Sequence, residues 1–303
     1  MAEPGVTVIV PVYNGERTLP ALYSALGSQK SHALGETEII VVDNGSTDQT
    51  RRITDAADIK GLRTVDEPRR GPPAARNRGI AEARGAVLAF LDADCVPTRA
   101  WLKELVAPFI DPEVIICAGG LASFPPKTAA QRFAARYGLN EAQRNLQARG
   151  IPFANTRNMA VRRSAAQVVG GFPVDLTPGE EVEFSHRIRQ RFGCEILYRP
   201  AALVFHQDRA TDVELFNQAH GYGRGTGRLY ALHPELLQFR WRHRLIRARR
   251  TGQRRLALAS ARLRTLLGKG NGEEREFADY LVKWDREFWL GFEEGRRIGK
   301  ASE

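Results

Sequence analysis

The N-terminal third of the chain alternates short apolar runs with segments in which apolar residues recur every three or four positions. The apolar runs, which predict buried strands, are Val6–Val10, Glu38–Val42, Leu62–Val65 and Ala86–Leu91. The segments with helical spacing are Thr18–Leu26, Thr47–Asp58 and Ala74–Arg84. Strands that alternate with helices form parallel crossover units, so this pattern predicts an α/β domain whose sheet is covered by helices on both faces.

The pattern is less regular in the rest of the chain. Helical spacing continues at Trp101–Phe109, Ala129–Ala148, Glu180–Phe192 and Arg275–Arg297. Further short strands are predicted at Val114–Ala118, Glu195–Tyr198 and Ala202–Phe205, the last two separated by Pro200. We therefore expect a mixed sheet and, after a Gly-containing linker at Lys269–Glu274, a helical C-terminal end.

Composition narrows the class of protein. The chain has 303 residues, of which 43% are apolar and 26% charged, so it can form a full core and is not expected to be disordered. No apolar run approaches the roughly 20 residues that cross a bilayer, and the first strand begins too early to leave room for a signal peptide. The three cysteines are far apart and lack metal-ligand spacing. We therefore expect a reducing, cytoplasmic location.

The net charge of +10 is concentrated in one segment. Eleven Lys and Arg residues, and no Asp or Glu, lie between Arg240 and Lys269, so the rest of the chain is close to neutral. Leu256, Leu263 and Leu267, with Ala259 and Leu266, share one helical face there. A basic amphipathic helix favours an anionic membrane surface. A solvated helix packed on the body and an oligomer contact remain alternatives, and nucleic acid is disfavoured because no binding motif accompanies the charge.

Three predicted strands end in polar sequence. These ends are Pro11–Glu16, Asp43–Asp48 and Asp92–Asp94. Because the carboxyl ends of parallel strands meet at one edge of the sheet, the three loops are expected to form a ligand site there. Asp92 and Asp94 are hard oxygen ligands that suit a divalent cation shared with phosphate. Each motif alone is more often a turn or a helix cap, and their succession carries the prediction.

Seven ordered motifs resemble those of family 2 glycosyltransferases. They are VIVPVYNGE (Val8–Glu16), IIVVDNGSTDQT (Ile39–Thr50), GPPAARNRGI (Gly71–Ile80), FLDADCVP (Phe90–Pro97), NMAVRRSAAQVVGGF (Asn158–Phe172), GEEVEFSHRIRQRFG (Gly179–Gly193) and YRPAALVFH (Tyr198–His206). The resemblance covers roughly residues 6–230 and implies a GT-A fold, a Rossmann-like mixed sheet flanked by helices. It also implies a catalytic domain over 1–230, with a nucleotide-binding half to about 110 and an acceptor half after it. A basic helical extension, 231–303, follows.

The resemblance assigns roles to individual residues. Those implied to bind the nucleotide sugar are Pro11, Tyr13, Glu16, Asp43, Arg76, Asp92, Ala93 and Asp94. Asp94, joined by His206, is implied to hold Mn²⁺ or Mg²⁺ together with phosphate oxygens, and the ordinary alternative for His206 is a structural histidine. Asn158 and Glu180 are expected on the acceptor side. Many relatives have Asp where this chain has Asn44, which leaves the base of the donor open.

The helix that begins at Glu180 carries the expected base. At about 100° per residue, Glu181 falls in the middle of a stripe formed by Phe184, Ile188 and Phe192, whereas Glu183 faces away. Burial would raise the pKa of a carboxyl in that stripe and make it a better base, although its place in the first helical turn opposes this. The resemblance also places the family's catalytic carboxylate at Glu181.

These features predict an inverting, metal-dependent glycosyltransferase. It would move a sugar from a nucleotide-diphospho-sugar to an acceptor hydroxyl, lipid-linked if the basic segment binds a membrane, in the synthesis of cell-surface glycans or glycolipids. One alternative is an inactive binding protein of the same fold that is recruited to membranes. Another is a sugar-nucleotide pyrophosphorylase, but the Gly-rich loop expected of that class is absent, since Val12–Glu16 holds one glycine. A dinucleotide-dependent oxidoreductase is disfavoured for the same reason.

Overall fold

The computed structural model describes residues 5–147, 150–237 and 241–301. The chain divides into two compact units. Residues 1–124 and 140–207 form the first unit, which contains the sheet, and residues 125–139 and 208–303 form the second, which is helical. We call them the sheet unit and the helical unit.

The sheet unit is built on parallel strands that follow the predicted apolar runs. They are β1 (Val6–Val12), β2 (Thr37–Asp43), β3 (Leu62–Asp66) and β4 (Val87–Phe90). Within the described residues the sheet has eight strands in the order β3-β2-β1-β4-β7-β6-β8-β5. Because β1 is flanked by β2 and β4 and is buried on both faces, its VTVIV run is almost continuously apolar.

The second half of the sheet is mixed, as the sequence predicted. There β7 (Met159–Arg162) lies antiparallel between β4 and β6 (Ile116–Ser123), and the short β5 (Cys95–Pro97) pairs antiparallel with β8 (Leu197–His206). The two strands predicted around Pro200 are one strand, β8. A register shift between Gly119 and Gly120 of β6 accommodates the proline, which has no amide hydrogen to donate.

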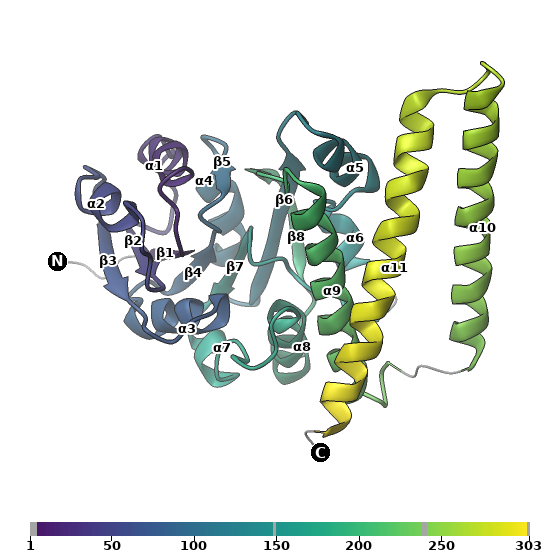
Figure 1. Ribbon diagram of the computed structural model, residues 1–303. Coiled ribbons are helices and arrows are strands. Elements are labelled where there is room, and N and C mark those ends of the chain that lie inside the picture. Colours follow the sequence, from purple (N-terminus) through teal and green to yellow (C-terminus); the bar gives the residue numbers. More distant parts are fainter. Residues whose placement is uncertain (1–4, 148–149, 238–240, 302–303) are drawn as a thin grey trace. The chain divides into compact units, whose positions relative to one another are not determined.

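Helices cover both faces of the sheet (Figure 1). One layer contains α1 (Leu19–Gly27), α2 (Thr50–Asp55), α4 (Trp101–Val106) and the 3₁₀ turn η1 (Ala107–Ile110). The other contains α3 (Pro72–Glu82), α7 (Arg163–Val168) and α8 (Glu180–Phe192). In the second layer Phe172 stacks on Phe184 at 4.1 Å between ring centroids, which fixes α8 against the sheet.

The long helix expected over Ala129–Ala148 is wrong. The helix α5 (Ala129–Tyr137) ends at Gly138, whose φ of 75° is the left-handed cap conformation that glycine adopts without strain. A separate short helix, α6 (Ala142–Leu146), follows in the sheet unit. Ala148 lies outside the described residues.

The helical unit pairs α9 (Asp212–Leu232) with α11 (Gly272–Ala301), and α10 (Trp241–Leu266) packs on α11. No helix was predicted at α9, whose several glycines are poor helix formers. The glycines allow close packing: a Cβ on Gly223 would lie 1.8 Å from the Phe288 carbonyl oxygen, and one on Gly291 would lie 2.0 Å from that of His220. Since α9 packs along α11, the division between the two compact units falls after residue 207, and the catalytic domain over 1–230 stays a prediction.

Aromatic side chains fill the core of the helical unit. Phe133 of α5 lies within 6 Å of the rings of Tyr280 and Trp284 on α11, with centroid distances of 5.6 and 5.8 Å. Among the described residues, no helix has both the length and the apolar composition of a bilayer span.

Candidate active site

Two loops interlock at the carboxyl edge of the sheet, where β1 and β2 end. The Gly15 amide donates to Thr50 Oγ1 at 2.7 Å, and the Glu16 amide donates to Asp48 Oδ2 at 3.1 Å. Glu16 Oε2 in turn accepts from the Gln49 amide at 3.1 Å. Glu16, which was expected to line the nucleoside, therefore joins the two loops. These contacts shape the first part of the expected nucleotide pocket.

Tyr13 and Asp43 lie at the carboxyl ends of β1 and β2, respectively. Tyr13, next to the half-buried Pro11, is 54% exposed, and the Arg70 guanidinium lies over its ring at 4.1 Å. Asp43 is buried, and its Oδ1 accepts from the Ser46 amide at 2.9 Å. Sequence analysis missed Arg70, although the Arg-Arg-Gly run before α3 was a signal for a cation beside the loop.

Asn44 has a structural part in this edge. Its amide nitrogen donates to the carbonyl oxygens of Glu67 and Arg69 at 2.8 and 2.7 Å, and its side-chain oxygen accepts from the Gly71 amide at 2.7 Å. A carboxylate has no N–H with which to make the first two bonds. The departure from Asp at this position is therefore explained by the loop that it holds.

The centre of the edge is a buried arginine between two carboxylates. Arg76 of α3 donates from one terminal nitrogen to Asp92 Oδ1 at 2.9 Å and from the other to Glu180 Oε1 at 3.0 Å. Arg76 is 4% exposed and Glu180 5%. The structure thus brings together two residues expected at the donor, Arg76 and Asp92, and one expected at the acceptor. We call these three residues the arginine bridge.

The arginine bridge is incompletely hydrogen-bonded. Arg76 Nε and Glu180 Oε2 are both buried and have no hydrogen-bond partner among the described residues. Burial, and then the nearby charge of Glu181, raise the pKa of Glu180 to about 7, against the opposing effect of Arg76. Burial lowers the pKa of Arg76, but Asp92 and Glu180 outweigh it and raise that pKa. A half-satisfied buried carboxyl at a strand edge is typical of a functional site.

Glu181 is placed differently from the prediction. It is partly exposed, whereas Glu183, expected to face away from the body, is buried and accepts from Arg187 Nε at 2.8 Å. The predicted apolar stripe was positioned partly by Phe192, but this residue of the last turn is 37% exposed. The buried face of the first turns therefore includes Glu180 and Glu183 instead of Glu181. Glu181 nevertheless follows Glu180 of the arginine bridge directly in the chain, and its charge raises the pKa of both Glu180 and Arg76.

Asp94 and His206 meet through strand pairing. Cys95 of β5 is in register with His206 of β8, and the Gln207 amide donates to the Asp94 carbonyl oxygen at 3.2 Å. These contacts bring His206 Nε2 to 3.5 Å from Asp94 Oδ2, with Ala93 half-buried in the preceding turn. Two ligands of one octahedral cation lie about 3 Å apart, so the pair fits a metal ion.

The pair would supply only part of a coordination sphere. Within the described residues, no group of three or more His, Cys, Asp or Glu side chains is arranged to hold a metal ion. The remaining ligands would then come from the substrate or from water, as in sites where a cation is shared with phosphate oxygens.

Asn158 does not face an acceptor. It is 1% exposed; its amide nitrogen donates to the carbonyl oxygens of Gly120 and Ala202, both at 2.7 Å, and its Oδ1 accepts from Trp101 Nε1 at 2.8 Å. These bonds join β6, β8 and α4 from the loop before β7. Its side chain is fully used, so its role is structural and the acceptor-side assignment is corrected.

The opposite, amino edge of the sheet also carries polar residues. Glu38, near the start of β2, is 3% exposed and accepts four hydrogen bonds, from Thr7 Oγ1, from the Arg63 and Arg84 Nε atoms and from the Arg84 amide, at 2.7 to 3.1 Å. Burial tends to raise the pKa of Glu38, but these donors outweigh it and lower that pKa.

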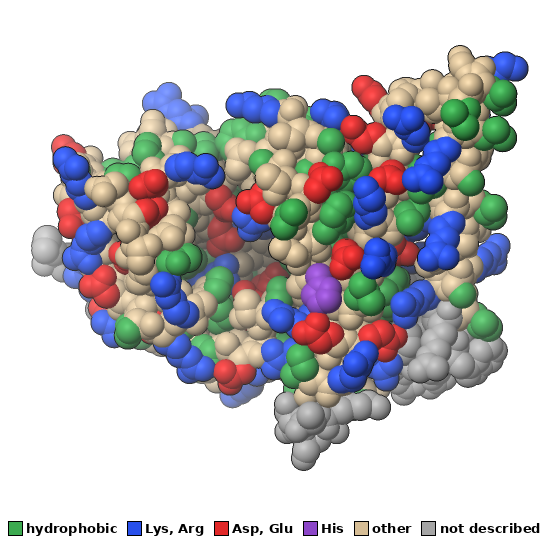
Figure 2. All heavy atoms as spheres, in the orientation of Figure 1, with side chains coloured by type: hydrophobic (Ala, Val, Ile, Leu, Met, Phe, Trp, Pro, Cys, Tyr) green, Lys and Arg blue, Asp and Glu red, His purple; other side chains and the backbone are tan. Residues whose placement is uncertain are grey.

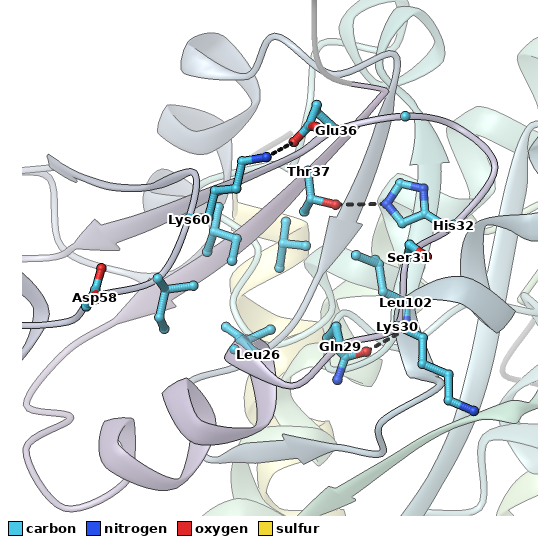
Figure 3. A pocket seen from close by; sticks show the side chains of 15 residues that line it. Leu26, Gln29, Lys30, Ser31, His32, Glu36, Thr37, Asp58, Lys60 and Leu102 are labelled. Carbon is cyan, nitrogen blue, oxygen red and sulfur yellow. Dashed lines mark hydrogen bonds and ion pairs between the residues drawn. The ribbon is translucent and has the colours of Figure 1, made fainter.

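A cavity of about 410 Å³ opens at the same amino edge (Figure 3). Its polar side chains pair with one another: Lys60 Nζ lies 2.9 Å from Glu36 Oε2, and His32 Nε2 lies 2.8 Å from Thr37 Oγ1. None of the expected site residues lines it. The candidate active site is therefore the carboxyl edge.

Comparison with known sequences shows the family to which the chain is similar. The sequence-family model described as Glycosyl transferase family 2 matches residues 7–170 of the chain. The chain is 35% identical over 235 residues to the glycosyltransferase AglE of Haloferax volcanii, covering 76% of this chain and 75% of AglE. It is 29% identical over 239 residues to the pre-mycofactocin glycosyltransferase of Mycobacterium tuberculosis, covering 76% of this chain and about half, 48%, of that protein.

Solved structures share the fold. The mannosyltransferase PcManGT from Pyrobaculum calidifontis, in complex with GDP-Man and Mn²⁺, aligns over 100% of this chain and 77% of its own with a TM-score of 0.56 and 19% identity. TarS 1–349 of S. aureus, in complex with UDP-GlcNAc, aligns over 97% of this chain and 92% of its own, with a TM-score of 0.53 and 17% identity. At these identities the likeness supports the GT-A fold, which agrees with the predicted fold class.

Proposed function

Because the chain belongs to glycosyl transferase family 2 and is a glycosyltransferase, we propose that it transfers a sugar from a nucleotide-diphospho-sugar to an acceptor hydroxyl with inversion at the anomeric carbon. The arginine bridge carries this proposal. It joins a buried cation to two carboxylates, and its Asp92 is two residues before Asp94 of the Asp94–His206 pair; both support a charged ligand at this edge.

The donor is proposed to lie along this edge. Tyr13 and Arg70 would contact the nucleoside, with Pro11 and Glu16 shaping the loops and Asp43 near the base. Asp92, held in place by Arg76, would accept a hydrogen bond from a ribose or sugar hydroxyl. Asp94 and His206 would hold Mn²⁺ or Mg²⁺, which when bound neutralises charge on the diphosphate leaving group. The Mn²⁺ complex of PcManGT supports the metal.

Glu181 is proposed as the general base. The acceptor oxygen attacks the anomeric carbon as the bond from that carbon to the phosphate oxygen breaks; the nucleoside diphosphate leaves, and the hydroxyl proton passes to Glu181. Partial exposure lets Glu181 meet an acceptor that arrives from solvent, whereas Glu180 Oε1 is already bonded to Arg76. Glu180 is proposed to keep Arg76 in position on the acceptor side.

The acceptor is proposed to be lipid-linked, with the enzyme at the cytoplasmic face of an anionic membrane. The cationic segment between Arg240 and Lys269 supports this location. Such an acceptor fits a role in the synthesis of cell-surface glycans or glycolipids.

The test is a thermal-shift panel of UDP-, GDP- and dTDP-sugars, each with and without Mn²⁺, followed by a donor-hydrolysis assay. A ligand that binds only the native state raises its melting temperature, so we expect one nucleotide class to stabilise the protein in a metal-dependent way. Hydrolysis of that donor to the free sugar and nucleoside diphosphate would exclude both an inactive binding protein and a pyrophosphorylase. The absence of any shift with every donor would contradict the proposal.

A further inference from the structure

The helix α10 has two unlike faces. Its inner face packs on α11: Leu258 and Ala261 are buried, and Thr251 Oγ1 donates to Asp285 at 3.1 Å. Four leucines stand on the opposite side, each 58% to 71% exposed: Leu245, Leu256 and Leu263 on α10, and Leu267 directly after its last residue. At about 100° per residue these four fall within about 40° of one another. They form a single line along the helix, which we call the leucine line.

Acidic residues of α11 pair with some of the arginines of α10 and leave others exposed. Arg247 Nη1 lies 3.1 Å from Glu293, and Arg254 pairs with Asp285. By contrast Arg249, Arg250 and Arg255 are exposed and form no ion pair within the part of the chain that the structure describes. At the helical period, Arg249 lies within the leucine line, and Arg250 and Arg255 lie about 120° and 100° from its centre in opposite directions.

The leucine line therefore contains one exposed cation, Arg249, and two further exposed arginines stand on the same helix. No Asp or Glu occurs between Leu245 and Lys269, and Figure 2 shows Lys and Arg (blue) and hydrophobic side chains (green) along α10. Arg240 and the side chains of residues 241–244 lie outside the described part of the segment. A cleft of about 600 Å³ between α10 and α11, lined by Arg255, Trp289 and Leu290, adjoins one side of the line.

We propose that this face docks on an anionic lipid bilayer, with the leucine line in the acyl boundary and Arg249, Arg250 and Arg255 at the lipid phosphates. The proposal deepens, and rests on, the membrane location proposed for the acceptor. A bilayer fits better than a protein partner, because a charged residue, Arg249, lies within the apolar line and no acidic residue occurs in this segment. The centres of protein interfaces are depleted of charge, whereas interfacial helices combine leucine with flanking arginine.

The test is flotation of the full chain with vesicles of phosphatidylcholine alone or mixed with phosphatidylglycerol. We expect binding to the mixed vesicles only, weakening as salt rises. The triple variant Arg249→Gln, Arg250→Gln, Arg255→Gln should bind roughly 10²-fold more weakly, since each cation near the surface contributes roughly five-fold. The variant Leu256→Ser, Leu263→Ser should bind at least about 10-fold more weakly. All four leucines and three arginines are exposed, so both variants should fold.

Matched controls change the same residue types elsewhere. The variant Arg52→Gln, Arg99→Gln, Arg191→Gln loses the same net charge from exposed positions, and Leu232→Ser, Leu236→Ser removes two exposed leucines; both should bind vesicles almost as the parent does. Metal-dependent stabilisation by donor should persist in every variant, which separates this proposal from the proposed chemistry.

Three outcomes would overturn the docking face. The parent could fail to float with the mixed vesicles, or the Leu256/Leu263 variant could float as well as the parent. Size-exclusion chromatography could instead show a dimer that this variant dissociates, which would assign the leucine line to a contact between two copies of the chain.

Discussion

Two buried glutamates occupy opposite edges of the same sheet and differ in how their charge is met. Glu38, at the amino edge, accepts four hydrogen bonds, and these donors lower its pKa. Glu180, at the carboxyl edge, receives one side-chain hydrogen bond, from Arg76; its other oxygen has no partner among the described residues, and its pKa is raised to about 7. Both residues are buried glutamates, so residue type and burial do not by themselves show which carboxyl is functional. The number of hydrogen bonds that each carboxyl accepts distinguishes them.

The difference in hydrogen bonding between the two glutamates indicates different roles for the two edges of the sheet. A fully bonded carboxylate stabilises the fold and has no lone pair left for a ligand. A partly bonded one costs stability, and such groups persist in native proteins where a ligand or a reaction uses them. The amino edge is therefore expected to carry stability and the carboxyl edge the chemistry.

The largest effect is expected from Glu181→Gln. Removing the base should lower kcat by about 10²- to 10⁴-fold while the stabilisation by donor and metal is kept, because the side chain would act only on the acceptor proton. The assay is sugar transfer or donor hydrolysis at saturating donor. Glu183→Gln, on the same helix, is the matched control and should retain turnover. Near-parental turnover in Glu181→Gln would remove this residue from the role of base.

The next effect concerns the metal pair. Asp94→Asn, or treatment with EDTA, should reduce activity by roughly 10²-fold or more, because charge on the diphosphate would no longer be neutralised. The stabilisation of the protein by Mn²⁺ with donor should also disappear. His32→Gln, at the amino edge, is the control and should leave the response to Mn²⁺ intact. Activity that survives in EDTA would refute the metal site.

Glu38→Gln should separate stability from activity. It should lower the free energy of unfolding by about 3 kcal/mol near neutral pH, because two arginines lose their shared carboxylate. Because the folded pKa of Glu38 is lowered, this loss should be full above the unfolded pKa and vanish as pH falls through the folded one. Urea unfolding at several pH values measures it. Glu36→Gln, an exposed partner of Lys60, should cost almost nothing. Loss of turnover in a folded Glu38→Gln variant would contradict the assignment of a purely stabilising role to the amino edge.

A change in stability of the opposite sign is expected from Glu180→Gln. Because the folded pKa of Glu180 is raised, its contribution to stability is full below the unfolded pKa and is lost as pH rises through about 7. The variant should therefore gain stability over the parent as pH rises from about 4.5 to 7, by roughly 3 kcal/mol at about 1.4 kcal/mol per pKa unit, a shift that already includes the opposing effect of Arg76. Parallel stability curves for parent and variant would show that the pKa of Glu180 is not raised, which would contradict the contrast with Glu38.

Local patterns explain which elements could be predicted. The apolar runs of β1, β2 and β4 and the helical spacing of α1 and α8 are properties of neighbouring residues, so they appear in the sequence. The helix α9 could not be predicted, because its glycines are favourable only through the close approach of α11. The short β5 has its pairing partner about a hundred residues away, in β8.

The features of the candidate site can also be divided into those that the sequence predicted and those that only the tertiary structure decided. The order of motifs in the sequence determined the fold class, the edge of the sheet and the carboxylates that gather there, because parallel strands must present their carboxyl ends together. Tertiary structure alone decided that Asn158 is a structural residue, that Glu183 is buried and that Arg76 joins Asp92 to Glu180. Those outcomes depend on which donors reach each polar atom across the fold, and such distances are not encoded in the spacing of residues along the chain.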